Sequence, residues 1–215
     1  MLALLAVLGL VAGRYVRTLA GAFTPAHPET PLDRRAEAGA ALRAVLRTVP
    51  VPAWPPTYEP VTAAVVVLVA WRAGPPYVYA ALAGTALAAI DWRTARLPDV
   101  ITLPSYPILM LTLLPTGELP RALLGGLALA AAYGVLWFAR PADLGLGDVK
   151  LAGLIGLASA ALSWQAWTVA ALGGQFLGAL YAVALLVTGR GTRRTQFPFG
   201  PFMLLGALTG LCLGR

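Results

Sequence analysis

Charged residues are scarce in this sequence. Only 12% of its 215 residues are Asp, Glu, Lys or Arg, which is about half of the share that soluble domains carry. Hydrophobic residues make up 59%, and the mean hydropathy is +0.75. This composition excludes an ordinary soluble domain and predicts an integral membrane protein with several spans.

Cysteine and histidine are almost absent as well. A single cysteine, Cys212, excludes an internal disulfide and a multi-cysteine zinc site. The single histidine, His27, stands in a proline-rich stretch without a second ligand nearby, so we predict no metal site. The net charge of +7 is not gathered in one soluble module. We therefore expect no nucleic-acid partner and interpret the excess of arginine as a signal of membrane topology.

The hydrophobic segments are separated by proline, glycine or charge, and they predict the fold. We expect an all-α, polytopic integral membrane helical bundle with about eight transmembrane helices. Several of these segments are shorter than the ~20 residues that a straight span needs, so some helices should be tilted or recessed inside the bundle. The expected spans are residues 2–23, 59–72, 75–91, 99–115, 118–139, 148–163, 165–189 and 199–214.

One long polar segment interrupts this pattern and divides the chain into three parts. Residues 1–23 form a first transmembrane helix, 24–58 a cytoplasmic loop with proline and arginine, and 59–215 a membrane-embedded domain. The first apolar run has no basic residue before it and two arginines after it, so it does not read as a cleaved signal peptide. The centre of the loop, "PLDRRAEAGAALRAVLRTV", can form an amphipathic helix. Such a helix lies either on an anionic membrane surface or in solvent.

The basic residues are distributed unevenly between the two ends of the expected spans. With the N-terminus outside, 13 of the 16 Lys and Arg residues fall in or beside the loops that follow spans 1, 3, 5 and 7. Only Arg72, Arg121 and Arg215 fall on the other side. Because cytoplasmic loops are enriched in Lys and Arg, the first group of loops is predicted to face the cytoplasm.

Two acidic residues meet the membrane at that cytoplasmic face. Asp91 directly follows the apolar run "ALAGTALAAI", and Asp148 stands in "LGLGDVKL" at the start of another span. Ionisable groups at membrane depth are candidates for function, because burying them without a role is costly. Two facing carboxylates share a proton, so that one can activate a water molecule while the other donates to a substrate carbonyl. Gly145 and Gly147 permit positive φ and close backbone approach, so that an extended peptide could lie near Asp148; the alternative is a flexible turn.

Three segments together carry a resemblance to a known family. They are "AIDWRTARLPDVITLP" (89–104), "GLGDVKLAGLIG" (145–156) and "FPFGPFMLLGA" (197–207). In this order they resemble the signatures of type IV prepilin peptidases, which are G-x-G-D aspartyl proteases. The resemblance covers about residues 60–214, so that 59–215 would be a membrane-embedded aspartyl peptidase domain.

The resemblance implies roles for individual residues. Asp91 and Asp148 correspond to the family's two catalytic aspartates, and no cofactor is implied. Asp99, which follows Pro98, is either the N-cap of its helix or a rival for the chemistry. Lys150 either stabilises the pair of acids or reaches lipid headgroups. "FPFGPF", with Pro198, Gly200 and Pro201, would be a scaffold beside the site.

The resemblance also implies a substrate and a location. The substrate would be a prepilin or pseudopilin with a short basic leader, cleaved at the cytoplasmic face of the inner membrane, and Asp143 and Asp99 are available to receive the leader. Pilus or secretion assembly components are possible further partners. Many members carry two C-x-x-C pairs and N-methyltransferase activity; without those cysteines, we expect a peptidase alone. The alternatives are a small proton or cation transporter or channel, and an inactive scaffold.

Overall fold

Helices make up the regular structure of this protein. The computed structural model describes residues 2–24, 30–49, 51, 57–141, 144–192, 195 and 197–214. Within these residues there is no strand, which confirms the predicted all-α fold. The α-helices are α1 (Leu2–Ala22), α2 (Pro31–Leu46), α3 (Tyr58–Arg72), α4 (Val78–Thr94), α5 (Asp99–Leu113), α6 (Leu119–Ala139), α7 (Leu146–Leu162), α8 (Trp164–Val187) and α9 (Gly200–Leu213). Short 3₁₀ turns, Pro75–Tyr77 and Leu114–Thr116, precede α4 and follow α5.

Every helix except α2 coincides with a predicted span to within a few residues. Four stretches are long and apolar enough to cross a membrane by themselves, namely α1, α5 with its 3₁₀ extension, α6 and α8. The chain is therefore an integral membrane protein, as its composition predicts. The number of about eight spans stays a prediction, since the other helices in the described part are shorter or less apolar.

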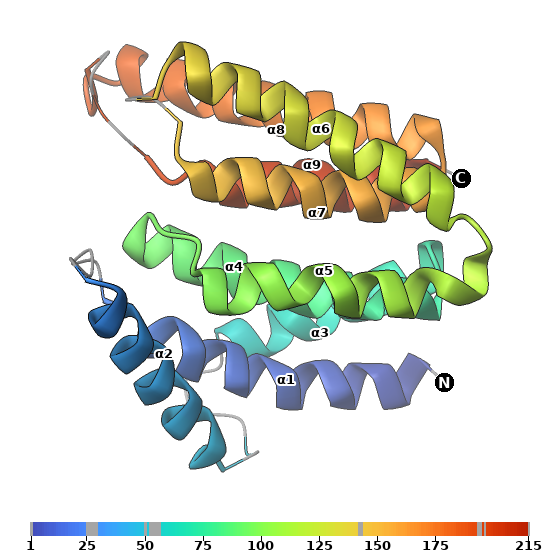
Figure 1. Ribbon diagram of the computed structural model, residues 1–215. Coiled ribbons are helices and arrows are strands. Elements are labelled where there is room, and N and C mark those ends of the chain that lie inside the picture. The colour runs from blue at the N-terminus through green and yellow to red at the C-terminus, as the bar shows by residue number, and fades with distance from the viewer. Residues whose placement is uncertain are drawn as a thin grey trace.

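The helices form two groups that lie against each other. Figure 1 shows α6, α7, α8 and α9 in one group and α1, α3, α4 and α5 in the other, all running roughly parallel or antiparallel. Helix α2 crosses this direction obliquely at one end of the bundle (Figure 1). The end of α4 and the starts of α5, α7 and α9 all lie at that same end, opposite the two chain termini (Figure 1).

Glycines bring pairs of helices into close contact. A Cβ atom on Gly156 of α7 would lie 2.4 Å from the carbonyl oxygen of Gly125 on α6, and one on Gly206 of α9 would lie 2.3 Å from the backbone nitrogen of Gly174 on α8. Membrane helices usually associate by close backbone approach through small residues. Lipid tails are as apolar as the side chains, so burying an apolar side chain gains little, and the helices depend on close van der Waals packing instead. These contacts tie α6 to α7 and α8 to α9.

A buried ion pair joins α1 to α3. Glu59, in the first turn of α3, has no exposed side-chain surface. Arg17 donates from Nε to Oε1 at 3.1 Å and from Nη2 to Oε2 at 2.8 Å. This two-pronged geometry is the strong form of the arginine–carboxylate contact.

The two described arginines at the opposite end of the bundle bind the ends of helices. Arg72 donates from Nε and Nη2 to the carbonyl oxygen of Cys212, near the end of α9. Arg121 donates to the carbonyls of Ala160, Ala161 and Leu162 at the end of α7. These arginines stabilise helix C-termini, where carbonyl groups lack helical partners.

Helix α2 is present in the polar segment where the sequence predicts it. Its first turn is capped by Thr30, whose hydroxyl accepts a hydrogen bond from the Asp33 N–H at 3.1 Å. Leu32, Leu42 and Leu46 on this helix are 59–76% exposed. The position of α2, on a membrane surface or in solvent, stays a prediction.

A polar contact holds α2 to the loop between α4 and α5. Arg96 donates to both carboxylate oxygens of Glu37, at 3.2 and 3.0 Å. Burial by itself would raise the pKa of Glu37, but hydrogen bonds from Arg96 and Thr24 outweigh it and hold the pKa below its usual value of 4.5.

We expect this contact to weaken in acid. A lowered pKa means that the contact contributes its full stability above the usual pKa and loses it as the pH falls through the lowered value. Proteolysis of α2 in detergent should therefore accelerate between about pH 5 and about pH 3. Glu37→Gln should make α2 equally sensitive at both pH values, and a wild-type pH response in this variant would exclude Glu37 as the cause.

Candidate active site

Asp91 lies in the last turn of α4, and its side chain points into the bundle. The residue is 4% exposed. Its Oδ2 accepts a hydrogen bond from the backbone N–H of Gly200 at 2.9 Å. The carbonyl end of α4 disfavours a negative charge at this position, whereas the N-terminus of α9 supplies both an N–H group and a favourable dipole. The start of α9 therefore compensates for the unfavourable position of Asp91 on its own helix.

Any larger residue in place of Gly200 would displace the Asp91 carboxylate. A Cβ atom at this position would lie 2.7 Å from Oδ2 and 3.2 Å from Cγ of Asp91. Cβ atoms essentially never come within 3.0 Å of a heavy atom from another part of the chain, so the Asp91 carboxylate would have to move. The "FPFGPF" segment was predicted to be a scaffold beside the site, and here its glycine contacts Asp91 directly.

We therefore expect Gly200→Ala to impair any activity that depends on the Asp91 carboxylate. Displacing a catalytic group by about 1 Å can cost roughly 100-fold in rate. The matched control is Gly21→Ala on α1, where an added Cβ meets nothing within 4 Å. Cleavage assays on membranes with equal amounts of each variant measure the effect. Equal activity of the two variants would show that the position of Asp91 tolerates the change.

Asp148 lies in the first turn of α7, at the same end of the bundle. Its Oδ2 accepts a hydrogen bond from the Gly145 N–H at 3.1 Å. An acid in the first turn of a helix is favourably placed relative to the helix dipole. The charge of Asp148 acts on Asp91, so the two carboxyl groups are near neighbours although they belong to different helix groups. Their catalytic role remains a prediction.

The glycines before Asp148 do not use the positive φ that glycine permits. Gly145 has a φ of −82°, and Gly147 is not among the residues with positive φ. The approach of a peptide to Asp148 past these glycines stays a prediction. A Cβ on Gly147 would lie 3.1 Å from Cβ of Leu97, so this glycine lets the loop between α4 and α5 pack on the start of α7.

Lys150 and Asp99 form an ion pair with each other. Lys150 Nζ lies 2.6 Å from Asp99 Oδ1, and both side chains are partly exposed. Pro98, and not Asp99, is the N-cap residue of α5, and no side chain caps this helix. The N-cap interpretation of Asp99 is therefore wrong: its carboxylate binds a cation on α7 instead of an N–H group of its own helix. An ion pair with this exposure contributes at most about 1 kcal/mol to stability.

Aromatic residues hold the start of α9 in place. Phe199 lies against Tyr133 of α6, with ring centroids 6.5 Å apart. Phe197 packs edge-on against Tyr181 of α8, at 5.3 Å. Pro201 follows Gly200 in the first turn of α9. A proline fits there because N–H groups in the first turn of a helix have no acceptor within the helix, so the N–H that proline lacks costs no hydrogen bond. Pro198 lies in the irregular segment just before this helix.

Several residues at the site were not singled out by the sequence analysis. Tyr106 of α5 donates to the backbone oxygen of Lys150 at 2.7 Å and so holds the first turn of α7. Tyr133 is 4% exposed and lies near Asp148. Neither tyrosine stands near an acid in sequence, so no local signal marks them.

Asp143 and His27 lie outside the described residues. Among the described ones, no group of three or more His, Cys, Asp or Glu side chains is gathered as metal ligands would be.

Comparisons with known proteins agree with the resemblance in the sequence. Residues 78–183 match the type IV leader peptidase family. A prepilin leader peptidase/N-methyltransferase of Burkholderia pseudomallei is 35% identical over 138 residues, which are 60% of this chain and 43% of that protein. The Escherichia coli protein of the same name is 33% identical over 135 residues, 58% of this chain and 57% of that protein. Leader peptidase HopD of Salmonella typhimurium is 32% identical over 133 residues, 56% of this chain and 81% of that protein.

These matches differ in how much of the relative they cover. The chain spans 43% of the length of the Burkholderia pseudomallei protein and 46% of a prepilin leader peptidase/N-methyltransferase of Aeromonas salmonicida. It spans most of the Salmonella protein. No solved structure matches the chain.

Proposed function

Because this chain belongs to the type IV leader peptidase family, we propose that it is a membrane aspartyl endopeptidase that removes the short basic leader of type IV prepilin-like proteins. The observation that carries the proposal is the pair Asp91 and Asp148. Two acids 57 positions apart in sequence, from 148 − 91, lie at the same end of the bundle (Figure 1), and each accepts a hydrogen bond from a backbone N–H group.

The proposed mechanism uses the two carboxyl groups and one water molecule. The pair holds one proton between its two acids. The ionised carboxylate takes a proton from water, and the resulting hydroxide attacks the carbonyl carbon of the scissile bond while the protonated carboxyl donates its proton to the carbonyl oxygen. When the tetrahedral intermediate collapses, the C–N bond breaks and the leaving nitrogen takes up a proton from the acid that accepted one from water. One hydroxyl group of the intermediate returns a proton to the other carboxylate as the new C=O bond forms. Both carboxyl groups then return to their starting states.

We propose that cleavage takes place at the cytoplasmic face of the inner membrane. Helix α2, the end of α4 and the starts of α5, α7 and α9 share one end of the bundle (Figure 1). In the sequence, 13 basic residues fall in the loops or flanks at this end and three at the other. The excess of positive charge supports a cytoplasmic position of this end.

The basic leader needs acidic groups to receive it. Asp99 and Asp143 are the candidates; of these, Asp99 is described by the structure, and its carboxylate is 45% exposed beside the start of α7. It is bound to Lys150, and a lysine or arginine of a leader would compete with Lys150 for it. The proposed substrates are prepilins or pseudopilins, and further contacts would be with pilus or secretion assembly components.

We further propose that the chain acts as a peptidase without N-methyltransferase activity. One cysteine in 215 residues cannot supply two C-x-x-C pairs. Mass spectrometry of mature pilin checks this: we expect an unmodified amino terminus when this chain acts alone, and a methylated one would contradict the proposal.

The direct test is co-expression of the chain with a prepilin-like protein. We expect the leader to be removed from the substrate in the presence of the wild-type chain, seen as a shift to the mature mass. Ion flux through proteoliposomes without any cleavage would instead support the transporter alternative.

A further inference from the structure

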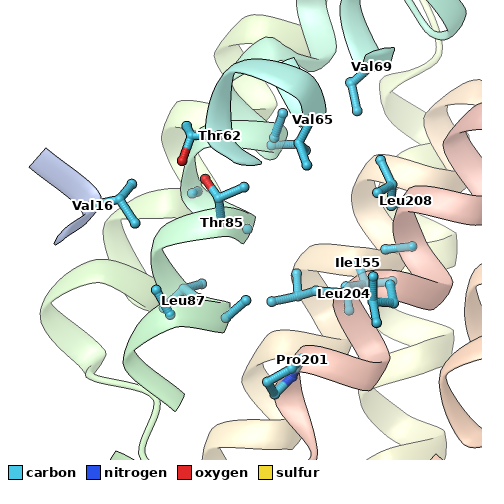
Figure 2. A pocket seen from close by; sticks show the side chains of 18 of the residues that line it. Val16, Thr62, Val65, Val69, Thr85, Leu87, Ile155, Pro201, Leu204 and Leu208 are labelled. Atoms are coloured by element: carbon cyan, nitrogen blue, oxygen red, sulfur yellow. The ribbon is translucent and has the colours of Figure 1, made fainter. Parts of the chain in front are cut away.

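An apolar cavity of about 480 Å³ lies between the two groups of helices. Figure 2 shows Thr85 and Leu87 of α4 on one side, and Pro201, Leu204 and Leu208 of α9 on the other. None of the described residues that line it carries a charge, and its polar side-chain groups are hydroxyls of Thr, Ser and Tyr and the indole N–H of Trp92. The cavity therefore suits a hydrophobic ligand.

The cavity begins beside the candidate active site. Asp91, Asp148 and Gly200 lie on α4, α7 and α9. Each of these helices also supplies a wall residue within about one turn of its site residue. These wall residues are Ala88 and Trp92 of α4, Leu151 of α7 and Pro201 of α9. A ligand that fills the cavity would thus extend to the edge of the pair of acids.

The cavity continues away from the site along the helices. Its α9 wall runs from Pro201 to Leu211, which is about 15 Å at 1.5 Å per residue. Along α4 the wall includes the small residues Ala80, Ala83 and Gly84. Since the volume suits several large side chains and not a whole helix, the cavity would accept the side chains on one face of an apolar segment.

We propose that this cavity binds the apolar segment that follows the scissile bond of the substrate. This inference rests on the proposed function and specifies which surface of the chain holds the substrate. The segment would lie against α4 and α9, with its polar end at Asp91 and Asp148. A membrane phospholipid is the less suitable occupant, because the described lining offers no basic side chain to a phosphate group. Binding along this wall would align the scissile bond before any chemistry occurs.

The test is disulfide cross-linking in vesicles with the full chain. Cys212→Ser removes the native thiol, and Asp148→Asn keeps the substrate uncleaved. One new cysteine is placed at Ala83, a wall residue of the cavity, or at Ala64 of α3, which is exposed and does not line it. The substrate has a basic leader, a glycine and an apolar helix. It carries one cysteine about eight residues after the cleavage point, because Ala83 is eight positions, or about 12 Å, from Asp91.

We expect the fraction of substrate that is cross-linked to be at least roughly tenfold higher with Ala83→Cys than with Ala64→Cys, a ratio that a difference in packing at one site can produce. Leu208→Cys on the opposite wall should behave like Ala83→Cys. Equal capture at Ala64 and Ala83 would overturn the proposal. So would labelling of Ala83→Cys by a phospholipid with a photoactivatable acyl chain that excess substrate does not displace.

Leader removal by the chain with both acids intact is measured separately. Cleavage without selective capture would overturn the cavity proposal alone. If the intact chain does not cleave the substrate at all, the proposed function itself is contradicted, whatever the cross-linking shows.

Discussion

Replacing Asp148 or Asp91 with asparagine is expected to abolish leader removal. Each carboxyl would hold or transfer a proton in the proposed mechanism, and an amide cannot do so at neutral pH. Loss of a general acid or base lowers rates by roughly 100- to 10,000-fold. Asparagine keeps the shape of aspartate, so Asp91→Asn can still accept from Gly200, and Asp148→Asn from Gly145. Both variants should therefore remain folded in the membrane.

Asp99→Asn is the matched control, because Asp99 lies at the same end of the bundle but binds Lys150. Its rate of cleavage should fall by no more than about tenfold, because this variant loses only one partly exposed ionic contact, with Lys150 or with the leader, and no group that transfers a proton. The measurement is the fraction of substrate without its leader, at equal amounts of each variant in the membrane. If Asp91→Asn still cleaves and Asp99→Asn does not, Asp99 is the first catalytic acid and our assignment is wrong.

Arg17→Met should cause the largest loss of stability among substitutions outside the site. Glu59 has no exposed side-chain surface and receives two hydrogen bonds from this guanidinium group. Removing one partner of a buried ion pair typically costs about 3–5 kcal/mol, because the other partner keeps its charge away from water. Methionine preserves much of the packing volume, so the loss should come mainly from the charge. The measurement is the Tm of the detergent-solubilised protein.

Two further variants identify the cause. Arg34→Met removes an exposed arginine of α2 and should leave the Tm nearly unchanged. The double variant Arg17→Met/Glu59→Gln should recover a large part of the lost stability, because no uncompensated charge remains buried. If Arg17→Met melts at the same temperature as Arg34→Met, the ion pair contributes nothing measurable.

The positions of the helices could be predicted well from the sequence. Each membrane helix is a contiguous apolar segment, and its ends are marked by nearby proline, glycine or charge. The same holds for α2, where Thr30 and Asp33 mark the start of a helix in the polar segment. Such signals lie within a few residues of the feature that they predict.

The interactions of single residues could be predicted less well. Asp99 was expected to cap its own helix, and it binds a lysine 51 positions away. Gly147 was singled out for the approach of a peptide, and it also makes room for Leu97. No local pattern assigns a partner to Glu59, and it is buried against Arg17, 42 positions away. In each case the partner is distant in sequence, so local patterns carry no information about it.

By itself the sequence determined that this is an all-α membrane protein, and it singled out Asp91 and Asp148 through the motifs around them. Only the tertiary structure decided that the start of α9 contacts Asp91, through a hydrogen bond from Gly200, which is 109 positions away in sequence. It also decided that the cavity between the helix groups begins beside the two acids. The physical reason is that hydrophobicity and helix ends depend on neighbours along the chain, whereas the contacts of a carboxylate depend on how separate helices pack.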